Sequence, residues 1–110
     1  MEFRLLKTVD TWVFDLDNTL YPPAMRLFDQ IEERMRYFVS DYLGVDLHQA
    51  DILRAEYWRI HGTTLAGMMD MHGMPPEAFL HYVHDIDFSV LSKSPRLAKL
   101  LKSLPGRKIV

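Results

Sequence analysis

The first regular pattern along the chain is the apolar run Thr-Trp-Val-Phe at residues 11–14, which ends at Asp15. The run is rich in β-branched and aromatic residues and has no alternation with polar ones. Such runs are typical of a strand that is buried on both faces in a parallel sheet. Pro22 and Pro23 then end the extended segment and suit the first turn of a helix. The pattern therefore predicts one buried strand, followed by a helical region.

The helical region begins with apolar residues at steps of three and four between residues 25 and 43, which predicts a helix with one apolar stripe. That stripe consists of Phe28, Ile31, Met35, Phe38, Val39 and Tyr42. Glu32 and Arg36 are four residues apart on the other side, where an ion pair would add modest support. Gly44 is placed to end this helix.

Four more helices are predicted from the same periodicity and from their capping residues. Gln49 completes a capping-box spacing with the first of these caps. The last helix is followed by Arg-Lys-Ile-Val at residues 107–110, which is typical of the opening of a second strand. The predicted limits are Asp46 to Gly62, Thr63 or Thr64 to Gly73, Pro75–Pro76 to about His84, and Ser94 to Pro105–Gly106.

Composition limits the classes of function. The 110 residues suit one small domain, and the formal net charge of −2 gives no electrostatic reason to expect nucleic acid or an anionic membrane as partner. The chain has no cysteine, so disulfides and thiolate metal sites are excluded. The N-terminal segment lacks the apolar core of a signal peptide, and no segment approaches a membrane span. A soluble cytoplasmic protein is the expectation.

The candidate chemistry lies in Asp15 and Asp17, which follow the predicted strand. In open α/β sheets, ligands bind in the crevice outside the C-terminal ends of the strands. Two carboxylates this close repel one another when both are ionised, so they need a cation or a shared proton. Mg²⁺, a hard ion that prefers oxygen ligands, would satisfy them. Two such residues are also common as turn formers or as helix N-caps, and this reading stays open.

The segment Phe-Asp-Leu-Asp-Asn-Thr-Leu-Tyr, residues 14–21, resembles the first motif of the haloacid dehalogenase superfamily, whose phosphatases carry Asp-x-Asp-x-Thr. Asn18, Tyr21 and the phrase Leu-Pro-Gly-Arg-Lys-Ile-Val at residues 104–110 are most similar to its pyrimidine 5′-nucleotidase subgroup. The resemblance implies an α/β fold with a Rossmann-like parallel core and an inserted helical cap. It assigns residues 1–22 to the first core strand and catalytic loop, 23–92 to the cap, and 93–110 to the return to the core.

The resemblance also implies roles for single residues. Asp15 matches the nucleophile that forms an aspartyl-phosphate, and Asp17 matches the general acid–base. Mg²⁺ would bind Asp15 and the backbone carbonyl of Asp17. Leu16, Asn18 and Thr19 would form the supporting loop, in which backbone N–H groups after Asp15 hold phosphate oxygens. Tyr21 is a candidate for the substrate entrance.

The expected function is Mg²⁺-dependent hydrolysis of a small phosphorylated metabolite, with a nucleoside monophosphate as the first candidate. The family also uses a Ser or Thr at the end of the second strand, a later Lys and later acids, and this sequence does not supply them. The 110-residue chain is therefore expected to be the N-terminal portion of a phosphatase, with little activity alone. The alternatives are a sugar-phosphate phosphatase, a phosphomutase, or a non-catalytic helical module that binds a partner.

Overall fold

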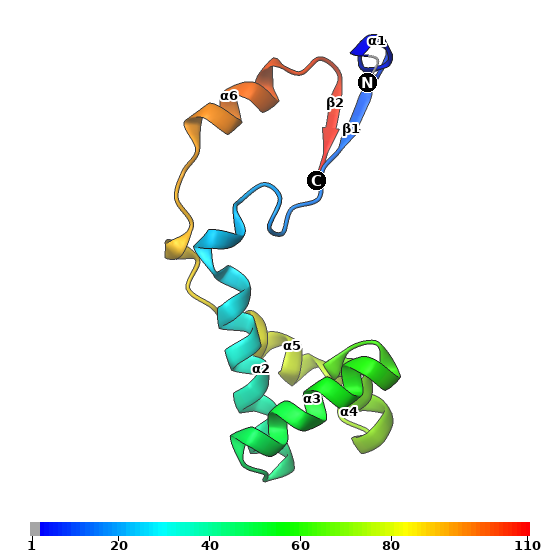
Figure 1. Cartoon of the computed structure of the whole chain (residues 1–110), viewed down its shortest axis with the longest axis vertical. Coiled ribbons are helices and arrows are strands. Elements are labelled where there is room, and N and C mark those ends of the chain that lie inside the picture. The colour runs from blue at the N-terminus through cyan, green and yellow to red at the C-terminus, as the bar shows by residue number, and fades with distance from the viewer. Residues whose placement is uncertain (1–2) are drawn as a thin grey trace. The chain divides into compact units, whose positions relative to one another are not determined.

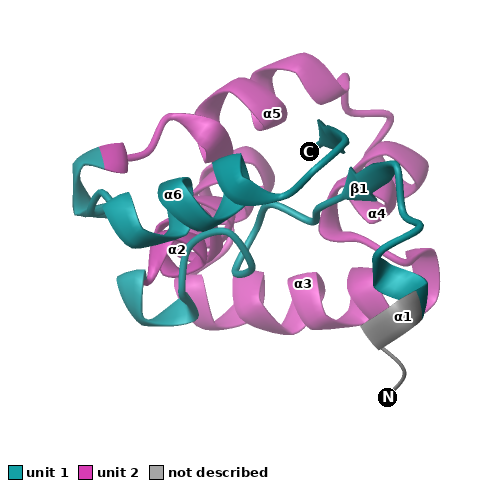
Figure 2. Cartoon of the chain, turned by 90° about the horizontal axis from the view of Figure 1, so that it is seen from above, with its two compact units in different colours: residues 1–25, 89–110 teal, residues 26–88 magenta. Residues whose placement is uncertain are grey.

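The computed structural model describes residues 3–110 of the chain, with side chains from Leu5 onward. The fold is mostly helical, with a small two-stranded parallel sheet (Figure 1). The chain forms two compact units, which Figure 2 colours separately. Unit 1 contains the residues up to Met25 and residues 89–110, and unit 2 contains Arg26–Phe88. Unit 2 is thus inserted in sequence between the two halves of unit 1.

The sheet of unit 1 pairs β1 (Thr11–Val13) with β2 (Arg107–Ile109) in parallel, with Trp12 opposite Lys108. Hydrogen bonds continue past both ends of the ladder. The Arg107 N–H donates to the Asp10 carbonyl (2.8 Å), and the Phe14 N–H donates to the Ile109 carbonyl (2.8 Å). Two strands that are far apart in sequence therefore lie side by side, with Asp15 at the C-terminal end of β1.

The strand β1 lies where the apolar run predicts it, but the prediction that both its faces are buried is wrong. Val13 is 76% exposed, and Ile109 opposite it is also exposed. Unit 1 has no fully buried residue among those whose burial the structure describes. A strand is buried on both faces only when neighbouring strands and covering layers enclose it, and the two-stranded sheet of unit 1 does not provide these.

The helix before β2 is α6 (Pro95–Ser103), which has Ser94 as its N-cap and Pro95 at its first position, as predicted. After α6 the chain turns through Gly106, whose φ of 92° lies in the region that favours glycine. A Cβ at Gly106 would collide with the Asp10 carbonyl oxygen. The Trp12 indole N–H also donates to the Pro105 carbonyl (2.8 Å). Glycine is therefore needed where β2 approaches β1.

Unit 1 also contains short helical turns that the periodicity did not predict, because they are only three or four residues long. They are α1 (Phe3–Leu6), the 3₁₀ turn η1 (Pro23–Met25), and the turn η2 (Phe88–Val90) at the boundary with unit 2.

Unit 2 consists of four helices, which are α2 (Leu27–Leu43), α3 (Leu47–His61), α4 (Thr64–His72) and α5 (Pro76–His84). Each was predicted, although α2 begins at Leu27 rather than at residue 25, because η1 ends there and Arg26 adopts a left-handed conformation (φ 57°). Seven of the buried residues form one cluster to which all four helices contribute: Val39, Ala50, Tyr57, Met68, Met74, Phe79 and Val83.

The capping predictions for unit 2 are confirmed. Gly44 ends α2 in the left-handed region (φ 64°). The Asp46 carboxylate accepts a hydrogen bond from the Gln49 N–H (2.7 Å), and the Thr63 hydroxyl accepts one from the Ala66 N–H (2.9 Å). Of the two candidate threonines, Thr63 is therefore the N-cap of α4, and Thr64 is its first residue.

The edges of the predicted apolar stripes are exposed rather than buried. In the stripe predicted for α2, Phe28 is 37% exposed and Tyr42 is 46% exposed. A helix in a bundle of this size buries only the centre of its apolar face, so residues at the margins remain in contact with solvent.

The predicted Glu32–Arg36 pair is replaced by contacts between helices. Glu32 forms an ion pair with Arg54 on α3, and the Arg36 Nε lies 2.9 Å from the Asp51 Oδ2. Both residues of α2 thus reach across to α3, which joins the two helices by charge as well as by packing.

Among the described residues, none of the helices combines the length and the apolar character needed to cross a membrane.

Candidate functional site

The candidate site lies in the segment that leaves the sheet after β1. The backbone remains bonded to β2 as far as Phe14 and then departs at Asp15. This is the C-terminal end of a parallel strand, where ligands bind in open α/β sheets. Asp15, Leu16, Asp17, Asn18 and Thr19 are all exposed. The sheet thus places the first carboxylate at its edge and leaves the following loop open to solvent.

The loop closes into a turn around the Leu16 carbonyl. This oxygen accepts hydrogen bonds from the Thr19 N–H (3.2 Å) and from the Leu20 N–H (2.9 Å). Asn18 has a φ of 53°, in the left-handed region that asparagine tolerates better than most residues. The Thr19 N–H is one of the predicted loop donors to phosphate. It could contact a phosphate only if its hydrogen bond to the Leu16 carbonyl opened.

The Thr19 hydroxyl connects the two acidic residues. It donates to the Asp15 Oδ2 (3.0 Å), and it also lies 3.3 Å from the Asp17 carbonyl oxygen, which shares the same proton. One hydroxyl thus holds a carboxylate oxygen and a backbone carbonyl oxygen close together. These are the two groups to which the resemblance assigns a metal ion.

The Asp17 side chain has a different partner. The Tyr21 hydroxyl donates to the Asp17 Oδ1 (2.8 Å). The pKa of Tyr21 is raised above its ordinary value, mainly by partial burial. The hydrogen bond to Asp17 and the negative charges of Asp17 and Asp15 raise the pKa further. A backbone hydrogen bond from Asn18 lowers it. Tyr21 therefore stays protonated at neutral pH and remains a hydrogen-bond donor to Asp17.

The position of Tyr21 sharpens the prediction for this residue. The sequence suggests only a place at the substrate entrance, whereas the structure brings its hydroxyl directly onto the proposed acid–base. The four-residue spacing between Asp17 and Tyr21 was a signal that could have indicated this contact, once the loop was taken as a turn rather than an extended strand.

The oxygen atoms of the loop suit a hard divalent ion. Two carboxylates, a backbone carbonyl and a hydroxyl are the kinds of ligand that Mg²⁺ binds, and this ion usually keeps several of its waters. In the part of the chain that the structure describes, no third His, Asp or Glu side chain joins the pair to form a larger cluster. Asp15 and Asp17 would therefore hold a metal ion with few protein ligands.

The alternative role of the two acids, as turn formers, is also visible in the loop. Residues 17–20 form a turn, and Asp17 is its first residue. Neither acid is the N-cap of an α-helix, because the next α-helix begins at Leu27. Forming a turn does not occupy the free carboxylate oxygens, so this role and a chemical role are compatible.

No known protein-family model matches the chain.

Proposed function

We propose that the chain carries the nucleophile and the acid–base of a Mg²⁺-dependent phosphomonoester hydrolase of the haloacid dehalogenase type. The observation that carries the proposal is the Thr19 hydroxyl, which joins the Asp15 carboxylate to the Asp17 carbonyl directly after a parallel strand. The resemblance of residues 14–21 to the family motif supports the same assignment.

In the proposed reaction, a free oxygen of Asp15 attacks phosphorus while the bond to the leaving oxygen breaks. Asp17 gives its proton to that leaving oxygen and then takes a proton from the water that hydrolyses the aspartyl-phosphate. The Tyr21 hydroxyl occupies Oδ1 of Asp17, so Oδ2 is the atom left to carry the proton. A bound Mg²⁺ would offset the negative charge of the carboxylate and the phosphate.

The proposed substrate is a small phosphorylated metabolite, with a pyrimidine nucleoside monophosphate as the first candidate from the subgroup resemblance. Unit 2 is the proposed cap, and its place in sequence between the two halves of unit 1 supports this. A sugar phosphate as the preferred substrate, or transfer of the phosphate within a sugar, would indicate one of the related phosphatases or phosphomutases. The cytoplasm is the proposed location.

Covalent phosphorylation tests the proposal without requiring efficient turnover. The Asp17→Asn variant keeps the nucleophile but lacks the base that activates water, so it should accumulate phosphate on Asp15. The variant is incubated with p-nitrophenyl phosphate and Mg²⁺, quenched in acid, and analysed by peptide mass spectrometry. The proposal predicts phosphate on Asp15 with Mg²⁺ and none with EDTA.

The double variant Asp15→Asn/Asp17→Asn is the control, and Asp29→Asn/Asp17→Asn is the matched control at an exposed acid on α2. Asp15→Asn/Asp17→Asn should remain unmodified, and Asp29→Asn/Asp17→Asn should carry as much phosphate as Asp17→Asn alone. Absence of phosphate on Asp15 in the Asp17→Asn variant would contradict the proposed function. Equal labelling of this variant with Mg²⁺ and with EDTA would also contradict it.

A second candidate function is a helical module that binds a partner protein. Exposed apolar side chains on unit 2 favour it, since Trp58 is 68% exposed, Met71 59% and Ile60 55%. If Asp15 is never phosphorylated, this candidate becomes the leading one.

A further inference from the structure

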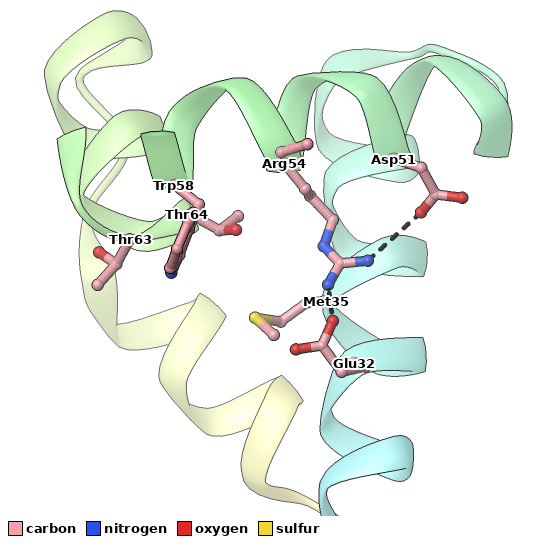
Figure 3. A pocket seen from close by; sticks show the side chains of 8 residues that line it. Glu32, Met35, Asp51, Arg54, Trp58, Thr63 and Thr64 are labelled. Carbon is pink, nitrogen blue, oxygen red and sulfur yellow. Dashed lines mark hydrogen bonds and ion pairs between the residues drawn. The ribbon is translucent and has the colours of Figure 1, made fainter. Parts of the chain in front are cut away.

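A cavity of about 590 Å³ lies within unit 2, between α2, α3 and the start of α4 (Figure 3). None of the residues that line it belongs to the Asp15–Tyr21 loop. Its lining includes one large aromatic side chain, a thioether, three charged groups and, besides the Thr63 hydroxyl that caps α4, a second hydroxyl. These are Trp58, Met35, Thr64, Glu32, Asp51 and Arg54.

The apolar part of the cavity offers a flat surface. Trp58 is 68% exposed although it is one of the largest apolar side chains in the chain. Met35 lines the cavity from the facing helix α2, as Figure 3 shows. An exposed indole beside a flexible thioether suits a planar ring, and the face of an indole attracts positive charge.

The terminal nitrogens of the Arg54 guanidinium already have carboxylate partners. The Arg54 Nη2 is paired with Glu32, and its Nη1 lies 3.3 Å from the Asp51 Oδ1. Asp51 is held by a second guanidinium as well, because the Arg36 Nε lies 2.9 Å from its Oδ2. Arg54 therefore has little to offer an anion, which would have to displace two carboxylates.

The acceptors, in contrast, have capacity left. The Glu32 side chain is 58% exposed and has a single ion-pair partner among the described residues, and Figure 3 shows its second oxygen turned away from Arg54. Each carboxylate oxygen can accept further hydrogen bonds. Of the charged groups that line the cavity, two are negative and one is positive.

Thr64 adds a hydroxyl with no protein partner. The residue is 8% exposed and lines the cavity, and within the described residues its side chain has no hydrogen bond. Thr63 provides the N-cap of α4, so Thr64 is not needed for that role. Buried polar groups nearly always have a partner, and a hydroxyl that opens onto a cavity is available to a ligand there.

We propose that this cavity binds a planar aromatic cation that carries N–H donors, such as an aryl amidinium or a protonated amino-heterocycle. Its ring stacks on Trp58, and its N–H groups donate to the Glu32 carboxylate and the Thr64 hydroxyl. The proposal is independent of the phosphatase function, because it involves none of the residues of the Asp15–Tyr21 loop.

Benzamidine and benzoate test the proposal as a pair of similar shape and opposite charge. Both are titrated into the ¹⁵N-labelled chain, and the two indole N–H resonances are followed by NMR. Benzamidine should shift the Trp58 resonance with a Kd of about 10 mM or below, as expected for so small a ligand. The Trp12 indole, which donates to the Pro105 carbonyl in unit 1, is the internal control and should not move.

Substitutions then locate the site. Trp58→Phe assigns the Trp58 indole N–H resonance, because that resonance disappears from its spectrum. The phenyl ring keeps a stacking face, so the binding of benzamidine that this variant retains is followed through backbone amide resonances. Trp58→Ala and Glu32→Gln should each weaken binding about tenfold, and Thr64→Val about fivefold. Glu56→Gln, at an exposed acid of α3 that does not line the cavity, is the matched control and should leave the Kd unchanged.

Three results would overturn the proposal. They are no shift of the Trp58 resonance with benzamidine, equal binding of benzoate, or equal binding by the Glu32→Gln and parent chains. The backbone spectrum of each variant shows whether its fold is intact, so a loss of binding is not confused with unfolding.

Discussion

At the scale of single residues, the candidate site depends on a hydroxyl group rather than on the acids alone. Asp15 and Asp17 are exposed, and water could solvate each of them separately. The Thr19 hydroxyl gives their oxygens a common partner. A hydrogen bond in an exposed loop contributes little to folding, so its effect should appear mainly in ligand binding.

Thr19→Val tests this role, since valine keeps the shape and removes the hydroxyl. We expect Mg²⁺ to bind the loop about fivefold more weakly, because the Asp15 carboxylate loses its positioning contact. The free energy of unfolding should change by less than about 1 kcal/mol. Thr8→Val, at an exposed threonine that donates to the Leu5 carbonyl, is the control and should leave Mg²⁺ binding unchanged. Equal affinity in both variants would contradict the role of Thr19.

Tyr57 gives a prediction for alkaline pH. Burial, and secondarily the charge of Glu56, raises the pKa of Tyr57 above its ordinary value of 10.0. A group whose pKa is higher in the folded state stabilises the fold fully below its unfolded pKa, and loses this contribution as the pH rises through the folded pKa. The free energy of unfolding should therefore fall above about pH 10.

Tyr57→Phe should remove the part of the decrease in the free energy of unfolding at alkaline pH that Tyr57 causes. At neutral pH the variant should be less stable by about 1 kcal/mol, because the 2.6 Å contact between the Tyr57 hydroxyl and the His72 Nε2 is lost. Urea unfolding on either side of about pH 10 measures both effects. Tyr42→Phe, at a tyrosine that is 46% exposed, is the control. If the free energy of unfolding of Tyr57→Phe falls at alkaline pH as much as that of the parent chain, the decrease has another origin.

At the scale of the elements, the close approach of α3 and α4 depends on Gly67. This residue is buried, and a Cβ at its position would overlap the side chain of Tyr57. Alanine normally favours a helix by about 1 kcal/mol over glycine. If helix propensity dominates, Gly67→Ala stabilises unit 2, and if the overlap with Tyr57 dominates, it destabilises unit 2.

We expect Gly67→Ala to destabilise unit 2 by about 1–3 kcal/mol, because the overlap forces the two helices apart. Chemical denaturation followed by circular dichroism measures the change. Ala78→Gly, at an exposed position of α5, is the propensity control and should cost about 1 kcal/mol. A more stable Gly67→Ala chain would show that α3 and α4 do not pack as described.

The elements also show what the sequence could predict. The caps at Asp46, Thr63 and Ser94 were predicted because a capping bond joins residues only three apart. The Glu32–Arg54 pair was missed because 22 residues separate its members, and no local pattern connects them. The same limit hid the cavity, whose walls come from three helices.

The acidic loop was predictable in part. The sequence placed Asp15, Asp17 and Thr19 in one loop, because the motif lies within five residues, and the structure brings their oxygens together. The contact between Tyr21 and Asp17 was not predicted, since it depends on the turn that the loop adopts. The burial of β1 was wrongly predicted, because burial depends on layers that a run of apolar residues does not specify.

At the scale of the whole molecule, the apolar core is unevenly distributed. The cluster of buried residues lies entirely in unit 2, and unit 1 has no fully buried residue among those whose burial the structure describes. Apolar burial is the main source of stability, so the two units should differ strongly in local stability.

Hydrogen exchange followed by NMR should reveal this difference. We expect the amides of Val39, Tyr57 and Met68 to be protected at least about a hundredfold more than those of Phe14 and Arg107, although all five lie in regular structure or at its ends. The Phe14 and Arg107 amides bond across the two-stranded sheet, which alone is only marginally stable. Similar protection in both units would contradict the uneven distribution of stability.

In the proposed function, Asp15 and Asp17 form a Mg²⁺-dependent phosphoryl-transfer site. The most direct measurement is a titration of the ¹⁵N-labelled chain with Mg²⁺, in which the amide resonances of residues 14–20 are compared in the parent, Asp15→Asn and Asp29→Asn chains. The claim predicts shifts confined to these residues that saturate at millimolar Mg²⁺, persist in Asp29→Asn and vanish in Asp15→Asn. Shifts that are absent from the parent, or unchanged in Asp15→Asn, would contradict it.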